Sequence, residues 1–199
     1  MTAKKPHPIT RHFKTGRGLA AWLKHNGKRV TFAVVTAKAK VKHPTNRAHR
    51  ALDLAAHFVG LKEHPAGSNI QMFGKWYGEN GVPWCAIFIS YVLSHVGRPF
   101  KYAFVPAIVA DARAAKNGLR PLTKDRVNAA IAAGHPVLAC YDWNHDGQAD
   151  HVEFVSSVTG ATVHAIGGNT GPADWSNGGE VAREARPISY VEQFVEVLG

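Results

Sequence analysis

The pattern of apolar positions changes from a helical to a strand-like period along the chain. From Asn46 to Gly60, apolar residues recur every three to four positions, which predicts a helix with one buried face that stops at the glycine. Residues 84–96 (WCAIFISYVLSHV) are apolar on nearly every side and predict a helix buried at the centre of a domain. A short helix is expected around residues 70–77, and Ala-rich helices are expected at 105–118 and 123–133.

The second half of the chain, after Pro136, follows a period of two. Segments with this pattern, separated by turn residues, predict strands at 137–141, 151–158, 161–167 and 180–188. Helices followed by antiparallel strands predict an α+β domain in which the helices pack on the sheet. The apolar run TFAVVTA at 31–37 is far shorter than the ~20 residues that a membrane-spanning helix needs, so no transmembrane segment is expected.

Charge is distributed unevenly and divides the chain near residues 44–46. The first 50 of the 199 residues contain 13 Lys and Arg and no acid, whereas the remainder contains 11 Lys and Arg against 14 Asp and Glu. We therefore expect a basic arm or small subdomain at 1–45 and a main domain at 46–199, with Thr45 capping its first helix. Within the arm, a short helix is expected at 19–24 and a strand at 29–37.

A basic arm of this kind is expected to bind polyanions in a salt-dependent way. Nucleic acid, anionic lipid headgroups and the anionic polymers of a bacterial wall all fit that charge, and a solvated, solubilising tail is the alternative. The opening residues carry positive charge but lack the apolar region of a secretory signal peptide.

The two cysteines have different surroundings. Cys140 lies in the apolar segment 137–141, where a thiol is expected to act as a small core hydrophobe. Cys85 begins the buried helix, and there the helix dipole and free amide groups favour the thiolate, as a nucleophile requires. The alternatives for Cys85 are a second buried cysteine or a disulfide with Cys140.

A thiolate nucleophile needs a base that takes and returns a proton, and a group that orients this base. His151 opens a predicted strand directly after an acidic turn, and Asn169 follows at the end of the next strand. The order cysteine, histidine, asparagine along a helix and then adjacent strands is similar to that of papain-like hydrolases.

Four segments, in this order, resemble the CHAP family of cysteine, histidine-dependent amidohydrolases and peptidases, which is common in phage endolysins and bacterial autolysins. The resemblance covers roughly residues 48–190 and lies in VGLKEHPAGSN (59–69), PWCAIFISYVLSHVG (83–97), YDWNHDGQADHVEFV (141–155) and IGGNTG (166–171). It implies a papain-like fold and a bacteriolytic peptidoglycan hydrolase that cuts an amide bond. The activity implied is that of an N-acetylmuramoyl-L-alanine amidase or an endopeptidase, with no cofactor for the chemistry.

The resemblance also implies roles for residues. Cys85 is the nucleophile, His151 the general base and acid, and Asn169 the orienting residue, while the Cys85 backbone amide is an oxyanion donor. Two departures concern the third position. Glu153 stands where relatives commonly have glycine and would share a strand face with His151, so it competes for that position. Gly167 stands where some relatives have glutamate.

The acidic turn before His151 matches the twelve-position pattern of an EF-hand calcium loop. Its flanks are predicted strands rather than helices, and an acidic Asp-Gly hairpin turn is the alternative. A bound calcium ion would fix the strand that presents His151 and would serve structure rather than chemistry. The expected ligands are Asp142, Asn144, Asp146, Gln148, Asp150 and Glu153.

Asn69, Trp84 and Trp143 lie beside the expected site in sequence and are candidates for substrate contact, the tryptophans by stacking on sugar rings. Core packing is the alternative for the tryptophans, and capping of the following helix is the alternative for Asn69. We expect a monomer that acts on bacterial peptidoglycan, with residues 1–45 holding it to anionic wall polymer. The absence of a leader favours a phage endolysin made in the host cytoplasm, or a virion-borne lysin. The rival from another class is an inactive CHAP-like module whose arm binds wall polymer or nucleic acid.

Overall fold

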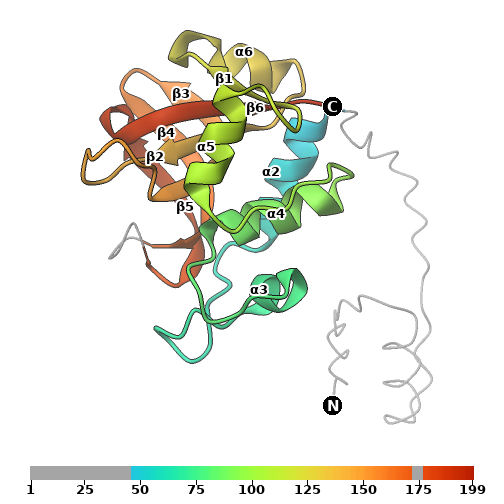
Figure 1. The fold of residues 1–199 in the computed structure, drawn as a ribbon, viewed down its shortest axis with the longest axis vertical. Helices are drawn as coiled ribbons and strands as arrows, with labels where there is room; N and C mark the ends of the chain where they lie inside the picture. Colours follow the sequence, from blue (N-terminus) through green and yellow to red (C-terminus); the bar gives the residue numbers. More distant parts are fainter. Residues whose placement is uncertain (1–45, 172–176) are drawn as a thin grey trace, which may run out of the picture. The chain divides into compact units, whose positions relative to one another are not determined.

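An antiparallel sheet organises the part of the chain that the computed structural model describes, residues 46–171 and 177–199. Its six strands lie in the order β1-β6-β2-β3-β4-β5, and every neighbouring pair is antiparallel (Figure 1). The strands are β1 (Leu119–Leu122), β2 (Val137–Tyr141), β3 (His151–Thr159), β4 (Thr162–Thr170), β5 (Glu180–Pro187) and β6 (Val191–Val197).

The helices precede or interrupt this sheet. Before β1 come α2 (Arg47–His57), α3 (Met72–Tyr77), α4 (Cys85–His95) and α5 (Val105–Arg113), and between β1 and β2 come a 3-10 turn (Lys124–Arg126) and α6 (Val127–Ala132). A second 3-10 turn (Ile188–Tyr190) joins β5 to β6. The expected α+β class is therefore confirmed, with helices packed on an antiparallel sheet.

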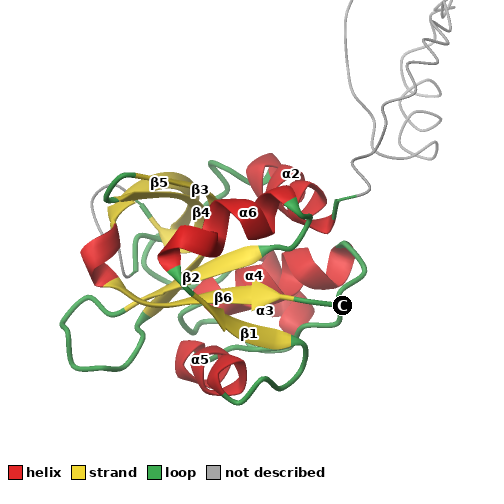
Figure 2. Cartoon of the chain, turned by 90° about the horizontal axis from the view of Figure 1, so that it is seen from above, coloured by secondary structure: helices red, strands yellow, loops and turns green. Residues whose placement is uncertain are grey.

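Alternate residues along strand β2 face two different hydrophobic cores. In β2, Val137, Ala139 and Tyr141 face the core that α6 covers, whereas Leu138 and Cys140 face the core of α4 and α5. Figure 2 shows α6 and α5 on opposite sides of the sheet. Strand β2 is buried at every residue because each of its two faces packs against one of these cores.

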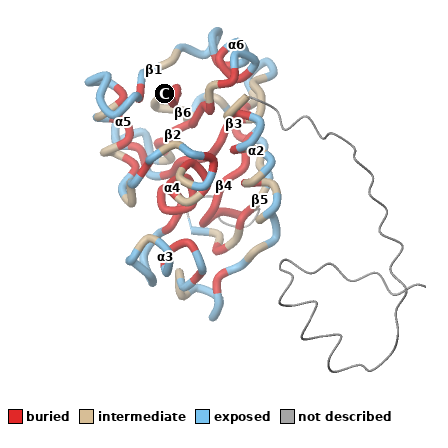
Figure 3. Tube along the Cα trace, turned by 90° about the vertical axis from the view of Figure 1, so that its right-hand side faces the viewer, coloured by how far each residue is buried: buried red, intermediate tan, exposed pale blue. Residues whose placement is uncertain are grey.

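Helix α4 is the centre of the larger core. Eight of its eleven residues are buried, among them Phe88 and Leu93, as the uniformly apolar segment predicts (Figure 3). The helix packs against β3 and β4. Its N-terminal residue, Cys85, is therefore held in place by a helix that is buried along most of its length.

Several boundaries differ from the expectation. The cap of α2 is Asn46, whose side-chain oxygen accepts the His49 amide, while Thr45 and the elements expected within residues 1–45 lie outside the described residues. Helix α5 ends at Arg113 instead of reaching 118, because the backbone turns to positive φ at Ala115 and Asn117 before β1 begins. Strands β1 and β6 were not expected.

Within residues 46–171 and 177–199, the helices are all too short or too polar to cross a bilayer.

Candidate active site

Cys85 lies at the first position of α4, with 5% of its surface exposed. The preceding residue, Trp84, is the N-cap and forms no side-chain capping bond. The first amide groups of a helix have no partner inside the helix, so those of α4 are available as donors at the end of the helix where Cys85 lies. Cys85 is a free thiol, as is Cys140, so the alternative of a disulfide between them is wrong.

His151 is the residue that the fold brings to Cys85. It is the first residue of β3 and is fully buried. Burial by itself lowers the pKa of His151, but hydrogen bonding and charge from Cys85 and Glu153 outweigh burial and raise this pKa to about 9. Cys85 and His151 are therefore near enough for their charges to interact, although neither ring nitrogen of His151 has a hydrogen-bond partner with standard geometry among the described residues.

Glu153 is the second partner of His151. Its Oε1 lies 3.3 Å from His151 Nε2, and both side chains are fully buried. Burial raises the pKa of Glu153, but hydrogen bonding and charge from His151 and Arg186 lower it overall, so the carboxylate is the stable form. Since Nε2 faces this carboxylate, Nδ1 is the ring nitrogen that remains for Cys85.

Arg186, on β5, completes this cluster and was not expected from the sequence. Its side chain is 1% exposed, and Nη2 lies 3.2 Å from Glu153 Oε1 and 2.6 Å from Thr170 Oγ1. Nη1 lies 3.5 Å from Glu184 Oε2, and the guanidinium carbon lies 5.6 Å from the centre of the Trp143 ring. The sequence signal for Arg186 is weak, because an arginine in the polar run VAREARP predicts an exposed side chain.

Gly167, on β4, provides the space in which Glu153 sits. A Cβ atom at Gly167 would come within 2.7 Å of Glu153 Cγ and 2.9 Å of its Oε1. Residue 167 is adjacent to Ile166, which pairs with Phe154 of β3. The carboxylate of Glu153 therefore occupies the space that a side chain at position 167 would fill. Position 167 is the one at which some CHAP relatives have a glutamate.

Asn169 lies near the end of β4, as expected, and is fully buried in the left-handed backbone region at φ 56°. Its Nδ2 donates a hydrogen bond of 3.0 Å to Asn177 Oδ1. Its Oδ1 is buried and has no hydrogen-bond partner. Of the two candidates for the third position, Glu153 is therefore the one whose carboxylate lies against the His151 ring.

The aromatic residues expected to stack on sugar rings differ in accessibility. Trp84 is fully buried and stacks on Phe73 at 5.7 Å between ring centres, so it is not open to a sugar ring. Trp143 is half-buried, stacks on Tyr141 at 4.8 Å and lies 6.0 Å from the His151 ring. Burial and the neighbouring Glu153 carboxylate raise the pKa of Tyr141, which keeps its hydroxyl protonated.

Asn69 lies in a loop that is fastened by Glu63. Glu63 is buried, and its Oε2 accepts the Asn69 amide at 2.8 Å while Oε1 accepts the Gly67 amide. The Asn69 carbonyl in turn accepts the Gly81 amide at 3.2 Å, in the segment that leads to Cys85. The loop of Asn69 is thus tied to the segment that enters α4.

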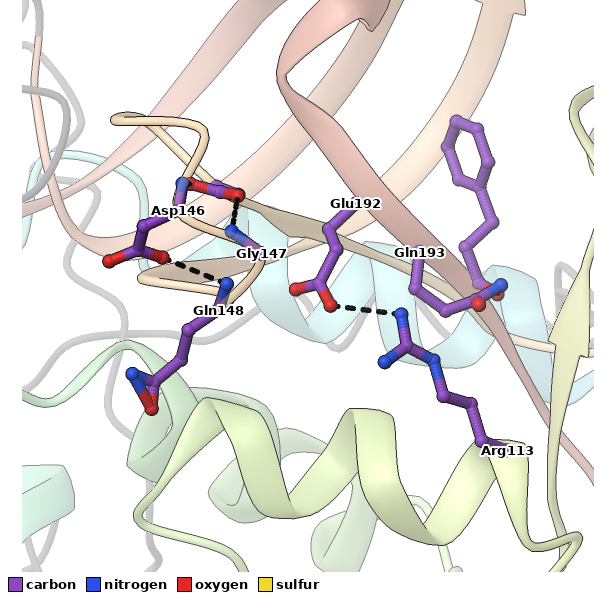
Figure 4. Close-up of polar contacts among 8 residues, drawn as sticks. Arg113, Asp146, Gly147, Gln148, Glu192 and Gln193 are labelled. Carbon is purple, nitrogen blue, oxygen red and sulfur yellow. Dashed lines mark hydrogen bonds and ion pairs between the residues drawn. The ribbon is translucent and has the colours of Figure 1, made fainter.

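The acidic turn expected to bind calcium is occupied by hydrogen bonds of its own. The two carboxylate oxygens of Asp142 accept the Asp146 and Gly147 amides, and Asn144 Oδ1 also accepts the Asp146 amide. Asp146 Oδ1 accepts the Gln148 amide (Figure 4). Asp150 Oδ2 accepts the Trp143 amide.

The sixth expected calcium ligand, Glu153, faces His151 and Arg186 instead. Among the described residues, no three ligand side chains of the His, Cys, Asp or Glu type gather closely enough to hold a metal ion. Asn144, Gln148 and backbone carbonyls are further oxygen donors of the expected loop, so calcium binding stays a prediction. The loop does adjoin the site, because the Asp150 amide donates to the Tyr141 carbonyl immediately before His151.

The arrangement brings together a thiol at a helix N-terminus, an imidazole and a buried carboxylate. This set can carry out nucleophilic attack on a carbonyl carbon with proton transfer to a leaving group. Comparison of the chain with models of protein families, with curated proteins and with solved structures finds no match.

Proposed function

We propose that this protein is a thiol-dependent amide hydrolase that acts on bacterial peptidoglycan. The single observation that carries the chemical part is the placement of buried His151 between two groups. It is near enough to Cys85, at the start of α4, for their charges to interact, and its Nε2 lies 3.3 Å from Glu153 Oε1. The substrate class rests on the resemblance of residues 59–69, 83–97, 141–155 and 166–171 to CHAP enzymes.

In the first half of the reaction, the Cys85 thiolate attacks the carbonyl carbon of the amide bond. The carbonyl oxygen becomes an oxyanion, and the first amide groups of α4, including that of Cys85, are directed toward it. When the tetrahedral intermediate collapses, the C–N bond breaks and the His151 imidazolium gives its Nδ1 proton to the leaving amine. The product that stays on the enzyme is a thioester of Cys85.

In the second half, water replaces the amine. Neutral His151 takes a proton from the water molecule, whose oxygen attacks the thioester carbonyl, and the C–S bond then breaks. The acid product leaves, and Cys85 and His151 return to the thiolate and imidazolium forms. Glu153 stabilises the imidazolium and fixes the ring orientation throughout.

The test is the loss of turbidity of purified peptidoglycan with wild type, Cys85→Ala and Cys140→Ala. Cys140→Ala is the matched control, because Cys140 is a buried thiol in the core of the sheet and has no place in the mechanism. We expect wild type and Cys140→Ala to solubilise the wall, and Cys85→Ala to be slower by about 10³-fold or more.

Mass spectrometry of the released fragments, after labelling of new amino groups, identifies the bond. An amidase frees the α-amino group of the L-alanine that was linked to muramic acid, whereas an endopeptidase frees an amino group inside the stem or cross-bridge peptide. Lysis that persists in Cys85→Ala contradicts the thiol mechanism. Absence of lysis by wild type across several wall chemotypes contradicts the substrate class and favours the binding-module alternative.

A further inference from the structure

We propose that Arg186 is a positioning residue that holds the Glu153 carboxylate against the His151 ring. The inference deepens the proposed function, since it rests on Cys85 and His151 acting as nucleophile and base. The polar side-chain partners described for Arg186 are Glu153, Thr170 and Glu184, and of these Glu153 is the one that lies against His151. Arg186 acts through Glu153.

The guanidinium group of Arg186 is held by two neighbouring strands. Its Nη2 is shared between Glu153 Oε1 on β3 and Thr170 Oγ1 on β4. Nη1 is directed to Glu184, and the face of the group lies over Trp143. A planar guanidinium with fixed donors holds a carboxylate in one orientation more strictly than a flexible ammonium does.

A single oxygen atom of Glu153 lies close to both Arg186 and His151. Glu153 Oε1 lies 3.2 Å from Arg186 Nη2 and 3.3 Å from His151 Nε2, so the same atom joins the arginine to the base. A buried carboxylate between a cation and an imidazole stays ionised, whereas the same carboxylate without the cation would carry the full cost of burial. Arg186 thus keeps the Glu153 carboxylate ionised, and the ionised carboxylate stabilises the His151 imidazolium.

The other groups around Glu153 do not supply a second permanent positive charge among the described residues. Tyr141 from β2 approaches the carboxylate, and Glu184 from β5 adds a second negative charge near Arg186. On the remaining side, Gly167 of β4 offers only a backbone. Among the charged groups that face Glu153 in the described chain, Arg186 is therefore the permanent cation, and His151 is the titrating one.

The experiment measures alkylation of Cys85 by iodoacetamide between pH 4 and 10, read by mass spectrometry of the Cys85 peptide. Alkylation reports the thiolate and needs no substrate, so it tests Arg186 even if peptidoglycan is not the substrate. The variants are Arg186→Met, Arg186→Lys, Glu153→Gln and the double variant Glu153→Gln/Arg186→Met. Arg183→Met is the matched control, because Arg183 is an exposed arginine of the same strand.

We expect Arg186→Met to move the acid limb of the alkylation profile upward by about one pH unit or more, because Glu153 then takes a proton more readily. Arg186→Lys, which keeps the charge, is expected to restore most of this shift, and Arg183→Met to leave the profile unchanged. In the Glu153→Gln background, Arg186→Met is expected to cause no further movement of the limb.

Two results would overturn the proposal. One is a folded Arg186→Met protein whose acid limb equals that of wild type. The other is a shift of the same size with and without Glu153, which would mean that Arg186 acts on Cys85 directly and not through the carboxylate. If Arg186→Met does not fold, Arg186→Gln, which keeps hydrogen-bond donors without the charge, is measured in its place against the same two outcomes.

Discussion

At the scale of single residues, the site depends on the relation between Glu153 and His151. A buried imidazole alone would lose its proton readily, yet the carboxylate and the Cys85 thiol raise its pKa to about 9. Since this value lies above the unfolded value of 6.5, the charged ring stabilises the fold fully below about pH 6.5, and this contribution is lost as the pH rises through about 9. Activity that needs the imidazolium is expected to fall over the same alkaline range.

The first prediction concerns Glu153→Gln. Removing the negative charge lowers the pKa of His151, so the alkaline limb of activity is expected to move to lower pH by about one unit or more. The pH profile of kcat/KM on peptidoglycan measures this shift. Glu192→Gln serves as a control, because Glu192 forms a separate ion pair with Arg113. An unchanged alkaline limb in Glu153→Gln would show that another group orients His151.

The second prediction concerns Gly167→Ala, which adds one methyl group at 2.7 Å from Glu153 Cγ. Neither backbone nor buried carboxylate can move far, so we expect a loss of stability of about 1–3 kcal/mol and a fall in Cys85 reactivity. In the Glu153→Ala background the methyl group has space, and the same substitution is expected to cost much less. A thermal double-mutant cycle measures the coupling, and simple additivity would contradict the shared space.

At the scale of elements, the sequence predicts the helices and strands whose apolar residues follow a clear helical or alternating period. Helix α4 and strands β2 to β5 follow from uniform or alternating apolar residues. Strands β1 and β6 were missed because β1 contains Pro121 within only four residues, and because β6 includes Glu196. Glu196 is buried only through its pairing with Arg120 and His135, which lie far away in the sequence.

The same reasoning explains which site residues the sequence could provide. Cys85 and His151 begin a helix and a strand, so their positions follow from local pattern. Glu153 follows as a competitor for the third position, because residues 151 and 153 share a strand face. Arg186 could not be predicted, since its burial depends on the order β3-β4-β5, which places it near a carboxylate that is distant in sequence.

The third prediction concerns the turn that leads into β3. Asp142→Ala removes the acceptor of the Asp146 and Gly147 amides, so we expect the melting temperature to fall by roughly 2–4 °C. Because these bonds need no metal, the fall is expected to be equal in EDTA and in calcium, as measured by scanning fluorimetry. A wild-type melting temperature that rises with calcium, and fails to rise in Asp142→Ala, would instead show that the loop carboxylates bind the ion.

At the scale of the whole molecule, the charge of the chain is divided between two parts with different expected tasks. Residues 1–45 contain 11 Lys and Arg and no acid, whereas residues 46–199 contain 13 Lys and Arg against 14 Asp and Glu. Every residue of the proposed thiol chemistry lies in the second part. The chemistry and the attraction to anionic polymer are therefore expected to be separable.

The last prediction compares the full chain with residues 46–199 alone. We expect the full chain to be retained on purified anionic wall at low salt and released as salt screens its charges, because the arm supplies the positive charge. The shorter chain is expected to bind weakly at every salt concentration, yet to alkylate Cys85 at the same rate and with the same pH profile. Co-sedimentation with walls measures retention, and alkylation confirms that the site is intact. Retention that persists with unchanged salt dependence in the shorter chain would place the wall-binding surface within residues 46–199 and contradict the role of the arm.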